Sequence, residues 1–397
     1  MDDESNPSLI MRVITAQGPT QLLSAIAILK YQLCTQGTSP VQDILVIGGL
    51  FSEHYIELIN ATKIIASQWS FCQTIVLGIN LSLTSSNPSS KFPGTSDLKH
   101  LEAADAIYVC RNWQPFNEAM IDLCRNADVI CYGDGFGTLD ALLPGPDDDS
   151  LQRRRKRLNR IVLHSPPDFS AFKYPLDSIV GILDIVPASY LLNVLEASSL
   201  LFPCIEDLLP RDTLITRQHL VLVALSNLSE SGWIRPHPFF SKLSQVAYLL
   251  KNLLRRLFSS WDLSAAEKHS SILLVPLFQL ISSREVRMYE EYLLRYLDRS
   301  AQIFLKAHPR QSYNQAEFLA ERLRRRGFNV ISSSIKFSVV PVELIIGFQS
   351  VNTFFAMGST SAHSVRFSPR CSDLEVYEQI DLDIRRKYLA SFALPLE

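Results

Sequence analysis

The sequence predicts an α/β protein with two domains, each built on a parallel, doubly wound sheet. The chain has 397 residues, enough for two or three domains at roughly 150 residues each. Hydrophobic residues make up 47% of the sequence and charged residues 20%, so the chain can bury ordinary cores. Short β-branched runs alternate with helix-length segments in both halves, which favours parallel strands joined by helices.

The first half contains five predicted strands, with helices between the first three. The strands lie at residues 11–16, 43–47, 73–77, 106–110 and 127–132, and the helices lie at 21–32 and 53–67. Residues 178–207 are predicted to be a helical connection. Because the loops after parallel strands meet at one edge of the sheet, we expect a ligand crevice there.

A second series of strands and helices fills the other half of the chain. Its predicted strands lie at residues 219–225, 272–276, 301–305, 330–334 and 344–346, and its helices at 239–258, 283–297 and 314–326. We therefore divide the chain into domains at 1–195 and 196–397. Such an architecture normally works through the cleft between its two halves.

Charge divides the chain in the same way. The formal net charge of −2 argues against nucleic acid as a partner. Residues 1–150 carry 7 basic and 17 acidic side chains, a net charge of −10, whereas residues 151–397 carry 31 and 23, a net charge of +8. The asymmetry predicts that the second half meets an anionic ligand or an anionic surface. The alternative is that these basic residues only solvate helices.

The sequence predicts a cytoplasmic protein. No run reaches the roughly 18–20 apolar residues of a membrane-spanning helix, and acidic residues stand at the start, where a secretory signal would be basic. Residues 244–261 have an apolar helix face with basic flanks, which predicts either a core helix or peripheral contact with the inner face of the membrane. The basic run at 153–157 is either a solvated loop or a further contact with an anionic partner. Seven cysteines without a CxxC pair predict reduced, buried thiols and no metal site.

The first candidate for chemistry is the segment Gly133-Asp134-Gly135, directly after a predicted strand. Glycines on both sides of an acid let the turn adopt unusual dihedral angles and leave the carboxylate exposed at the end of the strand. Such a carboxylate can act as a general base. The same tripeptide also forms ordinary turns.

The second candidate is the segment from Lys306 to Arg310, which includes His308-Pro309 after another predicted strand. The proline biases His308 toward an extended backbone, so the ring can project from the strand end. An imidazole between two cations suits an anionic leaving group. A lone His-Pro pair without a role is the alternative.

The third candidate is the hydroxyl-rich turn Gly358-Ser359-Thr360-Ser361. Its side chains can bind a phosphate, or they can simply cap a helix. The sequence contains neither a P-loop nor a GxGxxG segment opening a first-half helix.

In their order and setting, these segments resemble those of bacterial CMP-sialic-acid-dependent sialyltransferases of GT-B type, in particular the polysialyltransferase-like branch. That family has an acid-acid-Gly motif in its first domain, and a Lys-Gly-His-Pro-like motif, a Pro-x-Glu segment and a Ser/Thr cluster in its second. The residues matching these motifs, together with a first-strand loop, are Asp134 and Gly135; Lys306, Ala307, His308 and Pro309; Glu343; Ser359, Thr360 and Ser361; and Gly18, Thr20 and Gln21.

The resemblance implies two Rossmann-like domains that face a central cleft, and an inverting transfer of sialic acid from CMP-sialic acid to a hydroxyl of a glycan or glycolipid acceptor. Asp134 would be the catalytic base, and His308 the general acid or phosphate partner. The Ser/Thr cluster would bind the phosphate, Glu343 the ribose, and Lys306 with Ala307 the cytosine. No cofactor or metal is implied, because CMP leaves with a single phosphate.

The sequence departs from the family pattern at two of the motifs. Only one acid is present in Gly133-Asp134-Gly135, so Asp134 is the single candidate base, and Ala307 replaces the usual glycine. Alternatives are transfer of another CMP-activated 2-keto sugar acid, of the Kdo or legionaminic type, and a catalytically silent binding protein.

Overall fold

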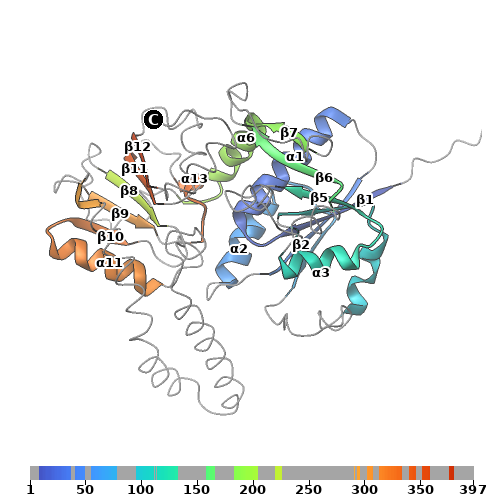
Figure 1. Cartoon of the computed structure of the whole chain (residues 1–397), viewed down its shortest axis with the longest axis horizontal. Helices are drawn as coiled ribbons and strands as arrows, with labels where there is room; N and C mark the ends of the chain where they lie inside the picture. The colour runs from blue at the N-terminus through green and yellow to red at the C-terminus, as the bar shows by residue number, and fades with distance from the viewer. Residues whose placement is uncertain are drawn as a thin grey trace, which may run out of the picture.

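We analysed the fold in a computed structural model. It describes residues 9–36, 41–49, 55–77, 95–110, 112, 114–132, 158–165, 183–203, 220–225, 290, 293–295, 302–306, 313–332, 339–345, 351–357 and 375–379. Its strands belong to two sheets, which lie in separate lobes of the molecule (Figure 1).

The first sheet has seven parallel strands in the order β3-β2-β1-β4-β5-β6-β7. Its strands are β1 (Ile10–Ala16), β2 (Val41–Ile47), β3 (Gln73–Val76), β4 (Ala106–Val109), β5 (Asp128–Tyr132), β6 (Arg160–Ser165) and β7 (Leu183–Pro187). Helices α1 (Pro19–Gln36), α2 (Tyr55–Ala66) and α6 (Ala188–Ser199) pack on one face, while α3 (Pro115–Leu123) and the 3-10 helix η2 (Thr95–Ala103) pack on the other. Alternate strand residues enter the two cores, as burial on both faces of a parallel sheet requires.

The second sheet has five parallel strands in the order β10-β9-β8-β11-β12. Its strands are β8 (Leu220–Leu225), β9 (Gln302–Lys306), β10 (Asn329–Ser332), β11 (Val351–Met357) and β12 (Glu375–Gln379). Helix α11 (Tyr313–Arg325) joins β9 to β10, and the short helix α13 (Val342–Ile345) precedes β11. The predicted α/β fold with two Rossmann-like parallel sheets is confirmed. The cleft between them stays a prediction.

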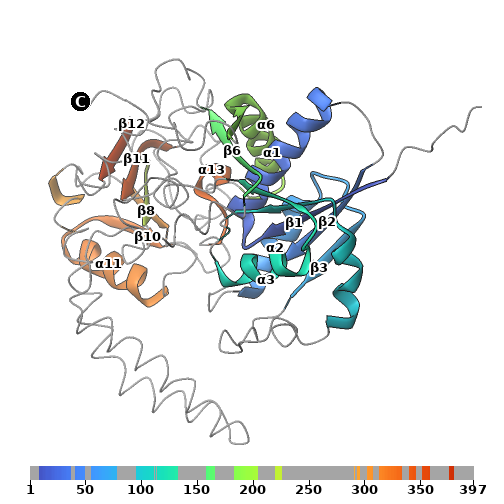
Figure 2. The same cartoon turned by 45° about the vertical axis from the view of Figure 1, so that its right-hand side comes forward.

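In the described part of the chain, one contact between the two halves is made by helices α13 and α6. Val342, Leu344 and Ile345 of α13 belong to the same buried cluster as Val194 of α6, and α13 packs against α6. In both views α13 lies beside α6, on the side of the second sheet that faces the first (Figures 1 and 2). The predicted domain boundary between residues 195 and 196 falls inside α6 and stays a prediction.

Two predicted elements are wrong. Residues 344–346 were expected to form a strand, but 342–345 form α13, with Leu344 N–H donating to Pro341 C=O at 3.0 Å. A short apolar run has no periodicity that separates a strand from one helical turn. Residues 183–187, expected to be helical, form β7, whose Ile185 and Val186 are β-branched. The predicted strand at 272–276 and helix at 239–258 lie outside the described residues, as does most of the helix at 283–297.

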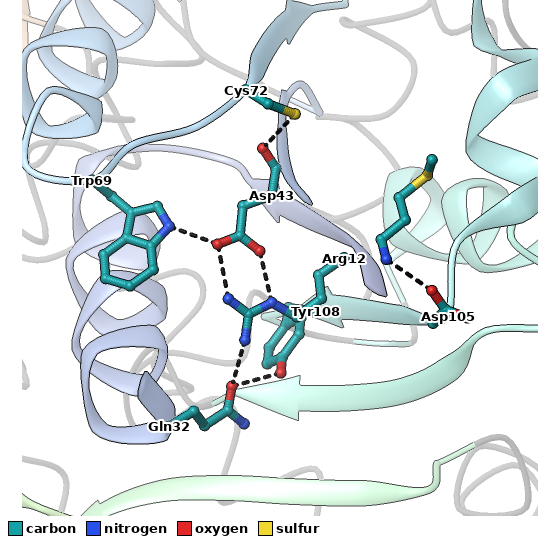
Figure 3. A network of polar contacts seen from close by, with 8 residues as sticks. Arg12, Gln32, Asp43, Trp69, Cys72, Asp105 and Tyr108 are labelled. Carbon is teal, nitrogen blue, oxygen red and sulfur yellow. Dashed lines mark hydrogen bonds and ion pairs between the residues drawn. The ribbon is translucent and has the colours of Figure 1, made fainter. Parts of the chain in front are cut away.

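A buried polar network fixes the first sheet to its helices (Figure 3). Arg12 of β1 donates two hydrogen bonds to Asp43 of β2, at 2.6 and 2.8 Å, and Trp69 donates to the same carboxylate at 2.7 Å. Gln32 of α1 accepts from Arg12 at 3.3 Å and from Tyr108 at 2.7 Å. Burial opposes the charge of Arg12, but its bonds to Asp43 outweigh that cost and raise the pKa of the guanidinium. The network makes β1, β2, β4 and α1 one unit.

Candidate functional site

The predicted site segments follow the carboxyl ends of parallel strands. Gly18 comes two residues after β1, Asp134 two residues after β5, and Ser359 two residues after β11, while Lys306 is the last residue of β9. In a doubly wound sheet, ligands bind outside these strand ends, near the point where the strand order reverses. That point lies between β1 and β4 in the first sheet and between β8 and β11 in the second.

Lys306 and Glu343 are brought together by the second half of the chain. Lys306 pairs with Ala224 of β8 in the sheet and is 4% exposed, and Glu343 lies in the first turn of α13. Burial lowers the pKa of Lys306 to about 8, although the negative charge of Glu343 acts in the opposite direction. The structure therefore places a buried lysine at the carboxyl edge of the second sheet, where the charge of the Glu343 carboxylate acts on it. Both residues are predicted to serve the donor.

The first-strand loop leads directly into α1. This helix begins at Pro19, two residues before its predicted start, and Leu22 N–H donates to Gly18 C=O at 3.3 Å. Proline is well suited to the first position of a helix because its missing N–H would have no partner there. Thr20 is exposed and Gln21 half-buried, so both side chains lie near the surface after β1.

The remaining predicted site residues lie outside the described part of the chain. They are Asp134, Gly135, Ala307, His308, Pro309, Ser359, Thr360 and Ser361. Their roles stay predictions, and only the strand ends that precede them are placed.

A neutral polar cluster at the carboxyl end of the first sheet was not predicted. It consists of Thr15, Gln17, Cys110, Asn117 and Tyr132, all nearly or fully buried. Gln17 Oε1 accepts from Cys110 Sγ at 3.1 Å and from Asn117 Nδ2 at 3.5 Å, and Gln17 Nε2 donates to Gly49 C=O at 3.3 Å. Pro115, two residues before Asn117, is a sequence signal for the start of a helix and could have placed Asn117 at this edge.

His164 of β6 is a second residue that the sequence did not single out. Both of its ring nitrogens are buried, and neither makes a hydrogen bond of normal geometry within the described part of the chain. Burial lowers the pKa of His164 to about 4, with a smaller opposing effect from the backbone of Ser24. The ring is therefore neutral at physiological pH.

The structure also bears on metals, thiols and membranes. Across the described segments, no group of three or more His, Cys, Asp or Glu side chains is arranged to hold a metal ion, and the expected metal independence stays a prediction. Cys110, Cys124 and Cys131 are buried and lie outside any disulfide, as expected, whereas Cys34 and Cys72 are exposed, contrary to the prediction. Apolar neighbours in sequence do not show which side of an element faces solvent. None of the described helices is long and apolar enough to cross a membrane.

No family model and no curated protein matches the sequence. Similar solved structures include a UDP-N-acetylglucosamine 2-epimerase from Listeria monocytogenes (10% identity, TM-score 0.47) and S. aureus MnaA with UDP (10%, 0.46). In both cases the match covers 96% of this chain and 82% of the other. Acinetobacter baumannii MurG matches at 10% identity and a TM-score of 0.35, over 97% of this chain and 90% of its own. Similarity at this level assigns neither a ligand nor a reaction to this chain.

Proposed function

We propose that the chain is an inverting glycosyltransferase that moves sialic acid from CMP-sialic acid to a hydroxyl of a glycan acceptor. The observation that carries the proposal is the position of Lys306, which is buried at the carboxyl end of β9, where the negative charge of Glu343 in α13 acts on it. These residues are 37 positions apart in the sequence, and the resemblance assigns both to the nucleotide. Uridine nucleotides appear in the names of two of the similar structures, so UDP is the comparison ligand.

The donor site combines charge with hydrogen-bond acceptors. Glu343 accepts from the two ribose hydroxyls, since a carboxylate can bind both at once. Lys306, with Ala307, flanks the cytosine and supplies a positive charge beside Glu343. Ser359, Thr360 and Ser361 donate to the phosphate, for which positioned donors supply about 2.7–4 kcal/mol of transition-state stabilisation.

Acid–base chemistry is divided between the two halves. Asp134 removes the proton from the acceptor hydroxyl, and Gly18, Thr20, Gln21 and Gly135 line the acceptor side. The hydroxyl attacks the anomeric carbon as the bond to the CMP phosphate breaks, and His308 protonates or hydrogen-bonds that phosphate. One displacement inverts the β-linked donor to an α-linked product. No metal is needed to bridge a diphosphate, because CMP carries one phosphate.

The catalytic assignment predicts the behaviour of two variants. Asp134→Asn and His308→Ala should each lower kcat by about 100-fold or more, since general acid–base groups supply roughly 10²–10⁴-fold. Initial rates of CMP release in the presence of acceptor, on variants with the circular dichroism spectrum of the wild type, measure the effect. Near-normal turnover by either variant would remove that residue from the mechanism.

The donor assignment predicts a loss of nucleotide affinity. Glu343→Gln should weaken CMP binding about tenfold or more, because it leaves one neutral acceptor where a carboxylate could bind both ribose hydroxyls. Glu321→Gln, which breaks the exposed ion pair with Arg325 on α11, is the matched control and should bind CMP normally. Calorimetry with CMP and UDP distinguishes the outcomes, and equal CMP affinity in both variants would contradict the role of Glu343.

A further inference from the structure

Tyr132 joins the carboxyl ends of two strands that are not neighbours. It is the last residue of β5 and is fully buried, and its hydroxyl donates to the carbonyl oxygen of Thr15 in β1 at 2.5 Å. Strand β4 lies between β1 and β5 in the sheet. The bond therefore ties the end of β5 to the end of β1 across the intervening strand β4.

The acceptor of this bond is itself held in place. Thr15 Oγ1 donates to Asn117 Oδ1 at 2.9 Å, and Asn117 is linked through Gln17 to the carbonyl of Gly49. Gly49 has a φ of 65°, and a Cβ at this position would lie 2.7 Å from Gln17 Nε2, so only glycine fits. The loops after β1 and β2 and the start of α3 are thus fixed together around Thr15 and Gln17.

We infer that Tyr132 is a positioning residue, whose hydrogen bond to Thr15 sets the point at which the segment carrying Asp134 leaves the first sheet. Tyr132 would not touch the substrate. Its effect on the reaction rests on the proposed role of Asp134 as base, because a base must lie within hydrogen-bond reach of the proton that it removes. Its effect on the strand end rests on the structure alone.

The chain offers a matched control in Tyr108. This tyrosine lies on the neighbouring strand β4, is 3% exposed, and donates its hydroxyl to Gln32 at 2.7 Å within the network around Arg12. Tyr108→Phe removes the buried hydroxyl that donates to Gln32, and Tyr132→Phe removes the one that donates to Thr15. A purely structural role for Tyr132 predicts that the two variants behave alike.

Buried thiols report on the strand end independently of activity. Cys131 precedes Tyr132, and Cys124 follows α3; neither forms a disulfide, and both are at most 1% exposed. Under native conditions, alkylation of a buried thiol follows local opening. Mass spectrometry should show Cys131 labelled at least tenfold faster in Tyr132→Phe than in the wild type. Cys124 should keep its rate in Tyr132→Phe, and both thiols should keep theirs in Tyr108→Phe. Unchanged labelling of Cys131 in Tyr132→Phe would overturn the inference.

Steady-state kinetics of the same variants test whether the hydrogen bond at the end of β5 affects the proposed reaction. In Tyr132→Phe, kcat should fall at least tenfold with the donor KM unchanged, because donor binding lies in the other half, while Tyr108→Phe should keep both values. If the wild type transfers sugar and the two variants turn over equally, the positioning role is wrong and the proposed function stands. If the wild type releases no CMP, the proposed function fails and the labelling of Cys131 alone decides whether Tyr132 fixes the strand end.

Discussion

At the scale of single residues, burial lowers the pKa of two basic side chains in the described part of the chain. Lys306 is at the end of β9, and His164 is near the end of β6. Burial lowers the pKa of both groups, to about 8 and about 4 respectively. Each of the two residues makes the stability of the protein depend on pH between its folded and unfolded pKa values, because the folded and unfolded chains bind different numbers of protons in that range.

For Lys306, stability should rise with pH in the alkaline range. The folded chain releases the proton near pH 8 and the unfolded chain near 10.5, so the cost of burying the charge disappears between these values. The free energy of unfolding should increase by about 3 kcal/mol across this range. Urea titrations at several pH values should show the increase in the wild type and in Lys63→Met, an exposed-lysine control in α2, but not in Lys306→Met. An equal rise in the free energy of unfolding of Lys306→Met would show that Lys306 is not its cause.

For His164, stability should fall with acid. Between pH 6.5 and about 4 the unfolded chain binds a proton that the folded chain does not, so unfolding becomes easier as the pH falls and levels off below 4. The loss is about 3 kcal/mol at most. His164→Gln should lack this part of the acid dependence, whereas His100→Gln, at an exposed position in η2, should retain it. Identical acid profiles for the two variants would contradict the burial of a neutral imidazole.

At the scale of elements, helix α11 shows where part of the positive charge of the second half is used. Arg324 and Arg325 pair with Glu317 and Glu321 on the same helix, and Arg322 and Arg326 both bind Glu290. These four arginines interact with the chain's own carboxylates. For α11 the structure thus favours the alternative that basic residues serve the helix itself.

The buried carboxylate of Glu290 should contribute more to the stability of the fold than the exposed ion pairs along α11 do. The Glu290 carboxylate is 5% exposed and accepts from Arg322 Nε at 2.6 Å and from Arg326 Nε at 3.3 Å. Glu290→Gln should lower the free energy of unfolding by about 2–3 kcal/mol, because it leaves two cations without their counter-charge. Glu321→Gln, which breaks an exposed pair, should cost about 0.5 kcal/mol. Chemical denaturation measures both losses. Equal losses of unfolding free energy in the two variants would show that the buried ion pair stabilises the protein no more than the exposed one.

The elements that the sequence predicted are those with a clear apolar period. Strands β1, β2, β8 and β9 and helix α11 agree with their predicted positions within a few residues, because β-branched runs and a long amphipathic helix are strong local signals. Strands β6, β11 and β12 were missed. His164 interrupts the apolar run of β6, and three polar residues, Glu375, Glu378 and Gln379, are among the five of β12.

At the scale of the whole molecule, the two sheets repeat one order of strands. In each, the first strand lies between the second and the fourth, so the chain reverses direction across the sheet at β1 and again at β8. The sequence could predict that its chemical segments follow strand ends, because turn residues come after apolar runs. It could not predict that Tyr132 would reach Thr15, because this contact depends on packing between strands that are distant in the sequence and not neighbours in the sheet.

The measurement that tests the central claim most directly is nucleotide release by the wild-type protein from a panel of activated sugars. We would incubate the protein with CMP-sialic acid, CMP-Kdo, a CMP-legionaminic-type donor and UDP-N-acetylglucosamine, with and without a glycan acceptor, in the presence of a chelator. Our account predicts release of CMP from CMP-sialic acid, faster with acceptor and unaffected by the chelator. Release of UDP alone, or of no nucleotide from any donor, would contradict it.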